Sequence, residues 1–159
     1  MPADVLPSTE WQWCHFDALD RAALYAILAQ RQDVFVLEQT CLFQDIDGID
    51  QQSWHLLAWQ GDGAARRLAA YLRCVPPGLK FAEASIGRVL TARWARGSGL
   101  GKALFAQGVA RTTALFPDSG IRISAQQYLE AFYASYGFVT CSAPYLEDGI
   151  WHVDMLKPG

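Results

Sequence analysis

The stretch IGRVLTARWARGSGLGK, residues 86–102, decides the fold of this 159-residue chain. Its first six residues carry aliphatic and β-branched bulk and predict the end of a strand. A helix is predicted to begin at the glycine at residue 99 and to continue to about residue 115. A strand that runs into a glycine-rich loop and then a helix places free backbone N–H groups at the positive end of a helix dipole. The stretch therefore predicts an anion-binding loop.

The loop Arg96–Lys102 alternates three glycines with other residues. These glycines let the backbone approach a ligand where a side chain would intrude, and nearby basic side chains add positive charge. A dinucleotide fingerprint does not fit, because the third glycine falls one residue early, at Gly101. A P-loop does not fit either, because Ala103 replaces the magnesium-binding hydroxyl. The loop thus predicts a pyrophosphate ligand without nucleotide hydrolysis, with a solvated basic turn as the alternative.

The patterns outside this stretch predict alternating strands and helices in one domain spanning residues 1–159. The middle connections are long enough for parallel crossovers, whereas both ends of the chain look antiparallel. We therefore expect an α/β fold with a mixed, partly parallel sheet of six to seven strands flanked by about four helices. The expected strands cover residues 10–16, 54–59, 68–75, 81–91, 121–125, 138–142 and 151–156, and the clearest helices cover 21–39, 99–115 and 128–136.

The composition and net charge of the chain indicate which classes of binding partner to expect. The chain has 13 basic and 16 acidic residues, a net charge of -3, which argues against binding to nucleic acid or anionic membrane. Its four cysteines are scattered and no apolar run approaches the length of a membrane span, so we expect a cytoplasmic protein. An EF-hand loop starting at Asp45 would need glycine where Asp50 stands, so we expect no metal. The acidic stretch around these residues is either a solvated loop or an attraction for a cationic amine.

Three segments in order resemble the GNAT superfamily of acyl-CoA N-acyltransferases. Arg96, Gly99 and Gly101 match its Arg/Gln-x-x-Gly-x-Gly/Ala signature. Residues 86–91 resemble its fourth strand, and the segment FYASYGF, residues 132–138, resembles its late helix and following strand. Residues 34–39, 45–48 and 147–152 further resemble the ElaA-type subgroup. The resemblance covers nearly the whole chain and implies a GNAT-like sheet.

By this resemblance, acetyl-CoA is the acyl-donor co-substrate. The loop and helix N-terminus hold its pyrophosphate, and the fourth strand pairs with its pantetheine arm as another strand would. The fourth and fifth strands splay apart to admit the thioester. Gln126 stands where the family often has an asparagine that touches the pantetheine. The cofactor-binding residues expected are Val89, Leu90, Thr91, Arg96, Gly97, Ser98, Gly99, Leu100, Gly101, Lys102 and Gln126.

Acyl transfer to an amine needs a neutral nucleophile, a donor to the oxyanion and a proton for the departing thiolate. Tyr133 matches the family's tyrosine acid, and a core aromatic is its alternative role. The oxyanion donor is expected to be a backbone N–H of the fourth strand, at Leu90.

The sequence offers four candidates for the general base: Glu38, His55, Glu83 and His152. Deprotonation of the amine through water, without a dedicated base, is a further alternative. Of these, Glu38 and His55 join Tyr133 as the expected catalytic residues. An internal ion pair with Arg31, one helical stripe away, is the alternative role of Glu38.

The sequence therefore predicts an N-acetyltransferase that moves an acetyl group from acetyl-CoA to a primary amine by direct transfer in a ternary complex. The acceptor is a small-molecule or peptide amine, and the aromatic and edge-strand content is compatible with a homodimer. The alternative is a non-catalytic sensor that binds an acyl-CoA or another phosphate ligand and acts through a partner protein. Tyr133 discriminates between the two, because a sensor needs no proton donor at the thiol.

Overall fold

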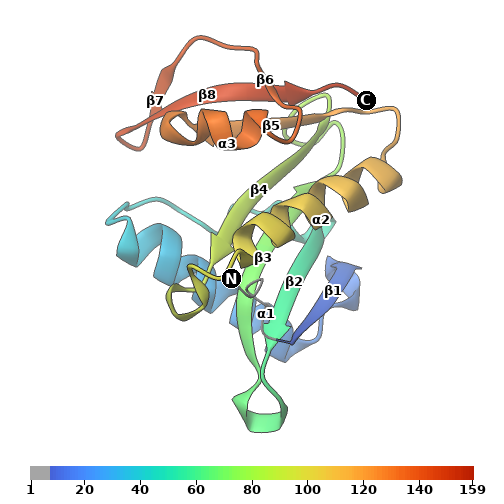
Figure 1. Ribbon diagram of the computed structural model, residues 1–159, viewed down its shortest axis with the longest axis vertical. Helices are drawn as coiled ribbons and strands as arrows, with labels where there is room; N and C mark the ends of the chain where they lie inside the picture. Colours follow the sequence, from blue (N-terminus) through green and yellow to red (C-terminus); the bar gives the residue numbers. More distant parts are fainter. Residues whose placement is uncertain (1–7) are drawn as a thin grey trace, which may run out of the picture.

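The computed structural model describes residues 8–159 and folds them around one mixed sheet (Figure 1). The first seven residues of the expected domain lie outside this description. Its strands are β1 (Thr9–His15), β2 (Trp54–Gln60), β3 (Arg67–Val75), β4 (Ala84–Thr91), β5 (Ile121–Gln126), β6 (Val139–Thr140), β7 (Tyr145–Glu147) and β8 (Ile150–Lys157). Its α-helices are α1 (Arg21–Arg31), which a π-helix over Gln32–Glu38 continues, α2 (Leu100–Leu115) and α3 (Glu130–Ala134).

The expected α/β class and mixed sheet are confirmed, with two differences in number. Residues 8–159 form eight strands and three α-helices, where six to seven strands and about four helices were expected. The additional strand is β7, whose three residues are too short to show an alternating pattern. No helix in residues 8–159 has the length and apolar character needed to cross a membrane.

The strand order is β1-β2-β3-β4-β5-β8-β6, and β7 also pairs with β8. Within the described chain only β4 and β5 pair in parallel, through Ala84 with Ile121 and Ser85 with Arg122. Beyond these two pairs the strands diverge, so that β5, β8 and α3 lie apart from β1–β3 (Figure 1). The divergence predicted for the fourth and fifth strands is therefore present. It leaves the edge of β4 unpaired from Ile86 to Thr91.

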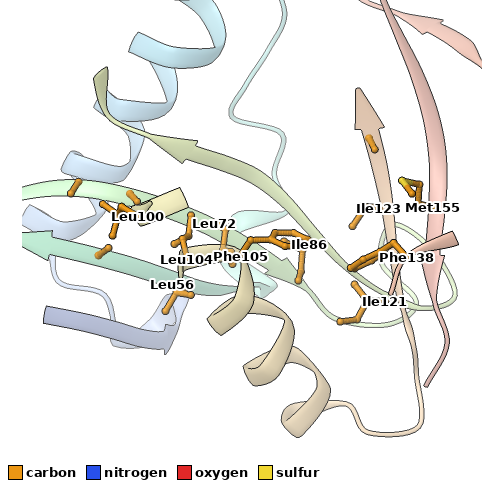
Figure 2. Close-up of a cluster of buried hydrophobic side chains, with 14 of the residues drawn as sticks. Leu56, Leu72, Ile86, Leu100, Leu104, Phe105, Ile121, Ile123, Phe138 and Met155 are labelled. Carbon is orange, nitrogen blue, oxygen red and sulfur yellow. The ribbon is translucent and has the colours of Figure 1, made fainter. Parts of the chain in front are cut away.

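The two long helices cover opposite faces of the sheet. Successive side chains of a strand point to opposite faces, and Leu56 packs in the cluster with α2 whereas Leu57 packs in the cluster with α1. Figure 2 shows Leu104 and Phe105 of α2 among the apolar side chains of the strands. Leu100, at the start of the same helix, is almost fully buried. The core therefore fixes the N-terminus of α2 beside the end of β4.

A β-bulge interrupts β4 close to that point. Tyr71 and Arg73 of β3 are two residues apart, but their partners Leu90 and Gly87 in β4 are three apart. The extra residue gives Arg88 a φ of 51°, a left-handed conformation that is uncommon outside glycine. The bulge leaves the backbone of Arg88 and Val89 without a partner residue in β3.

Candidate active site

The glycine-rich loop forms an open cradle at the start of α2. Gly99 precedes the helix with a φ of 83°, and a Cβ atom built on it meets no atom within 4 Å. No side chain caps the helix, and its first backbone hydrogen bond runs from Ala103 N to Gly99 O at 3.2 Å. The N–H groups of residues 100–102 therefore have no partner within the helix. Free amides, open space and a helix dipole together suit a phosphate group.

Two clefts meet beside this cradle. The loop cleft, about 340 Å³, is lined by the glycine-rich loop, the end of β4 and α3. The main cleft, about 520 Å³, lies between the diverging strands β4 and β5 and extends to β7 and β8. Both are lined by Val89, Thr91, Arg96, Leu129 and Tyr133. The shared lining makes one continuous path from the cradle to the space between the strands.

Tyr133 stands where the two clefts join. Its ring packs edge-on against Phe105 of the core, with the ring centroids 5.1 Å apart. Its hydroxyl makes no hydrogen bond to the described residues. Burial, with a smaller contribution from Tyr128, raises the pKa of Tyr133 to about 12. The phenol is thus both part of the apolar core and a protonated donor at the cleft, so its two expected roles do not exclude each other.

Comparison with known proteins identifies the family. A model of the GNAT acetyltransferase domain matches residues 79–158, which include β4, the glycine-rich loop and Tyr133. The chain belongs to the GNAT acetyltransferase family. Family membership implies an acyl-CoA donor.

Relatives of this GNAT protein cover almost its whole length. It is 40% identical over 146 residues to a UPF0039 protein of Synechocystis sp., across 92% of this chain and 93% of the relative. It is 37% identical over 150 residues to protein ElaA of Escherichia coli, across 93% and 95%. The expected ElaA-type resemblance is thereby confirmed.

Solved structures agree with this assignment. The fold matches the crystal structure of an acyl-CoA N-acyltransferase from Pseudomonas aeruginosa with a TM-score of 0.88 and 40% identity, covering 94% of this chain and 99% of that one. It matches the crystal structure of Escherichia coli ElaA with a TM-score of 0.86 and 36% identity, at the same coverage.

The residues expected to hold the donor in this GNAT protein lie together. Ser98 lines neither cleft, and its hydroxyl donates to the carbonyl of Ala95 at 2.9 Å. The guanidinium of Arg96 donates to the carbonyl of Thr91 at 3.0 Å and to Glu38 at 2.8 Å, so it braces the end of β4. The other expected residues line one or both clefts: Val89, Leu90, Thr91, Arg96, Gly97, Gly99, Leu100, Gly101, Lys102 and Gln126.

The structure does not bring Glu38 to either cleft. Its carboxylate pairs with Arg96 at 2.8 Å and lies 3.9 Å from Arg93. The expected ion pair with Arg31 is also absent, because Arg31 pairs with Asp45 and Asp50 instead. The expected roles of Glu38, as a catalytic residue and as the ion-pair partner of Arg31, are therefore corrected: its carboxylate holds the guanidinium of Arg96 near the surface.

His55 is likewise separated from the clefts, which corrects its expected catalytic role. Only 1% of it is exposed, and its Nε2 lies 3.0 Å from the carbonyl of Asp50. Since a carbonyl only accepts, Nε2 carries the proton, and Nδ1 accepts from the Tyr71 hydroxyl at 2.7 Å. Burial lowers the pKa of His55 to about 4. A neutral histidine with both nitrogens engaged cannot reach a substrate.

The acidic stretch is not a solvated loop, because its carboxylates pair with arginines. Asp50 accepts from Arg31 at 2.6 Å and from Arg73 at 2.8 Å, and all three side chains are buried. Asp45 and Asp47 pair with Arg88 at 2.8 and 3.3 Å and so hold the bulge of β4. The stretch is the counter-charge of three arginines beneath the main cleft. Arginines within otherwise apolar helix and strand segments were the sequence signal for this network.

The far wall of the main cleft presents a polar surface that the sequence analysis did not identify as a unit. Ser124, Gln126, Glu147 and His152 all line it. They come together because Gln126 pairs with His152 in the β5–β8 ladder and β7 folds back onto β8. Glu83, which was also considered as a base, lines neither cleft. Of the four base candidates named from sequence, His152 is the one that the fold places at the main cleft.

Proposed function

We propose that this protein is an N-acetyltransferase that moves an acetyl group from acetyl-CoA to a primary amine by direct transfer in a ternary complex. The observation that carries the proposal is that Tyr133 lines both the loop cleft and the main cleft. A phosphate cradle on one side, a polar wall on the other and a protonated phenol between them suit the meeting of an acyl donor and an acceptor.

Each part of the path has a chemical role. The free amides at the start of α2 hold the pyrophosphate, and the unpaired edge of β4 pairs with the pantetheine arm. Acetyl-CoA supplies the acetyl group as an activated thioester. Arg88 and Val89 of the bulge have no partner residue in the β3 register, whereas Leu90 pairs with Tyr71. We therefore assign the donor to the acyl oxygen to the bulge rather than to Leu90.

The proposal is tested by the release of free thiol from acetyl-CoA. The acceptors are spermidine, an aminoglycoside, L-lysine and a short peptide with a free N-terminus. We expect at least one amine to be acetylated and Tyr133→Phe to lower kcat about 10²-fold or more. Acetyl-CoA affinity should be nearly unchanged in this variant, because the cradle is intact.

Tyr136→Phe is the matched control. Tyr136 packs against the same Phe105 ring at 4.9 Å, but it lines neither cleft. It should retain wild-type turnover. Undiminished turnover in Tyr133→Phe would remove the phenol from the mechanism. Tight acetyl-CoA binding without thiol release from any acceptor would favour the sensor.

A further inference from the structure

We infer that His152 is the general base that takes a proton from the acceptor amine, with Glu147 as its counter-ion. The inference rests on the proposed function and deepens it, because it assigns the far wall of the main cleft to the acceptor. His152 lies in β8, and Glu147 ends β7 beside it. Both line the main cleft.

The protonation pattern of the imidazole is set by the backbone. His152 Nδ1 lies 2.7 Å from the carbonyl oxygen of Ile150. A carbonyl oxygen only accepts, so Nδ1 carries the hydrogen and donates it. In the neutral ring, Nε2 therefore keeps its lone pair. Nε2 makes no hydrogen bond to the described residues, which leaves it available to a ligand in the cleft.

The ring is also held in place from one side. It stacks on Tyr145, with the centroids 5.9 Å apart and the planes 20° apart. The Tyr145 hydroxyl donates to Asp154 at 2.6 Å and contacts the Ser124 hydroxyl. Asp154 is in turn fixed by Arg122 at 2.8 Å. A base whose orientation is set by two further groups needs little rearrangement to accept a proton.

An acidic turn lies beside Nε2 of His152. The nearest carboxylate oxygen, on Glu147, lies 3.9 Å from Nε2. Asp148, next to it in the turn, also lines the main cleft. Lys80, Arg88 and Arg96 also line this cleft, and Lys80 lies within electrostatic range of Glu147. The carboxylates of the turn between β7 and β8 are thus the charges beside Nε2, and they suit an incoming ammonium.

The other histidines of the chain offer no such arrangement. The sequence contains three, of which His55 is enclosed by Tyr71 and Asp50. His15 lies in β1, at the opposite end of the strand order, where its Nδ1 accepts from the backbone of Asp17. His152 is thus the histidine with both a free ring nitrogen and a place at the main cleft.

The proton transfers balance as follows. His152 Nε2 takes one proton from the ammonium form of the acceptor, which leaves a neutral amine and an imidazolium. The nitrogen then forms its bond to the acyl carbon as the bond from that carbon to sulfur breaks. Tyr133 gives its proton to the sulfur and regains one from the nitrogen of the new amide. The products are an amide, a free thiol and one proton, which His152 releases to solvent.

The experiment measures kcat for His152→Ala with the amine of the panel that gives the highest kcat/KM with the wild-type protein. We expect kcat to fall about 10²-fold or more, and added imidazole to restore it at least several-fold by occupying the vacated volume. Acetyl-CoA affinity, measured by calorimetry, should be unchanged. Glu147→Gln should lower kcat by a smaller factor, because the base remains.

His15→Ala is the matched control, since it also removes a histidine that lies near a carboxylate, here that of Asp17, and it should retain wild-type kcat. If His152→Ala fails to fold, His152→Ser with imidazole replaces it, because serine also leaves space for the ring. Undiminished kcat in a folded variant overturns the inference, and so does a loss that imidazole does not restore. If the wild-type protein releases no thiol with any amine, the proposed function itself has failed.

Discussion

Among single residues, the contrast between His55 and His152 shows how backbone contacts decide what a histidine can do. Both lie in strands of the sheet, and in both a main-chain carbonyl fixes the position of one ring hydrogen. In His55 the remaining nitrogen accepts from the buried Tyr71 hydroxyl, whereas in His152 it remains free at the main cleft. One ring is therefore part of the core, and the other can exchange protons.

The burial of neutral His55 predicts a pH dependence of stability. Its pKa is lowered from an ordinary 6.5 to about 4 in the folded chain. Between these values the unfolded chain binds a proton that the folded chain does not, so stability is lost as pH falls from about 6.5 towards about 4. From pH 7 to pH 5 we expect the free energy of unfolding to fall by about 2 kcal/mol. Urea unfolding at the two pH values measures this.

His55→Gln provides the control for that measurement. It removes the titrating group, so the difference between pH 7 and pH 5 should largely disappear even though the variant is less stable at both. An unchanged difference in the variant would assign the acid sensitivity to other groups. Asp47, whose pKa is held at about 2 against the opposing effect of burial by its hydrogen bond to Arg73, loses its stabilising contribution only at lower pH.

Sequence alone could locate Tyr133 and the glycine-rich loop but could not distinguish the histidines. The loop and the tyrosine belong to motifs of a few neighbouring residues, so the sequence alone is enough to recognise them. The protonation and burial of His55 depend on Tyr71 and Asp50, which lie in other elements and contact it only in the folded sheet. Glu38 was assigned to the wrong partner for the same reason, since helical spacing does not reveal the loop that approaches Arg31.

Among the elements, the proposed donor site is formed by the N-terminus of α2 and the C-terminal end of β4. Gly99 ends the loop in a left-handed conformation, and the space beside it is open. A side chain there would occupy the cradle itself. The strand, loop and helix were predictable from sequence because they are contiguous, whereas β7 was missed because it is defined by its pairing with β8.

We expect Gly99→Glu to weaken acetyl-CoA binding at least about 100-fold, or about 2.7 kcal/mol, because a carboxylate would fill the anion site. Calorimetric titration with acetyl-CoA measures the change. Gly63→Glu is the matched control: Gly63 also has a positive φ and open space, but it lies in the turn between β2 and β3. Wild-type affinity in Gly99→Glu would place the donor elsewhere.

Across the whole molecule, one buried network joins the helical and sheet parts that frame the main cleft. Arg31 comes from α1, Arg73 from β3 and Arg88 from β4, and the loop carrying Asp45 and Asp50 lies between them. Burial alone would raise the pKa of Asp50, but its contacts with Arg31 and Arg73 outweigh this and lower it. The network therefore connects α1, β3 and the loop of Asp45 and Asp50 to the bulge of β4, which borders the main cleft.

Removing Asp50 should destabilise the whole fold, because the buried Arg31 and Arg73 then keep only Asp45 and Asp47 as charged partners. Asp50→Asn leaves Arg31 and Arg73, which are 0% and 1% exposed, without their shared carboxylate. We expect the free energy of unfolding to fall by about 3–5 kcal/mol. In Glu10→Gln, which removes the exposed partner of Arg66, the expected loss is under about 1 kcal/mol. Urea unfolding of both variants at pH 7 distinguishes these cases, and equal losses would show that the buried network contributes no more than a surface pair.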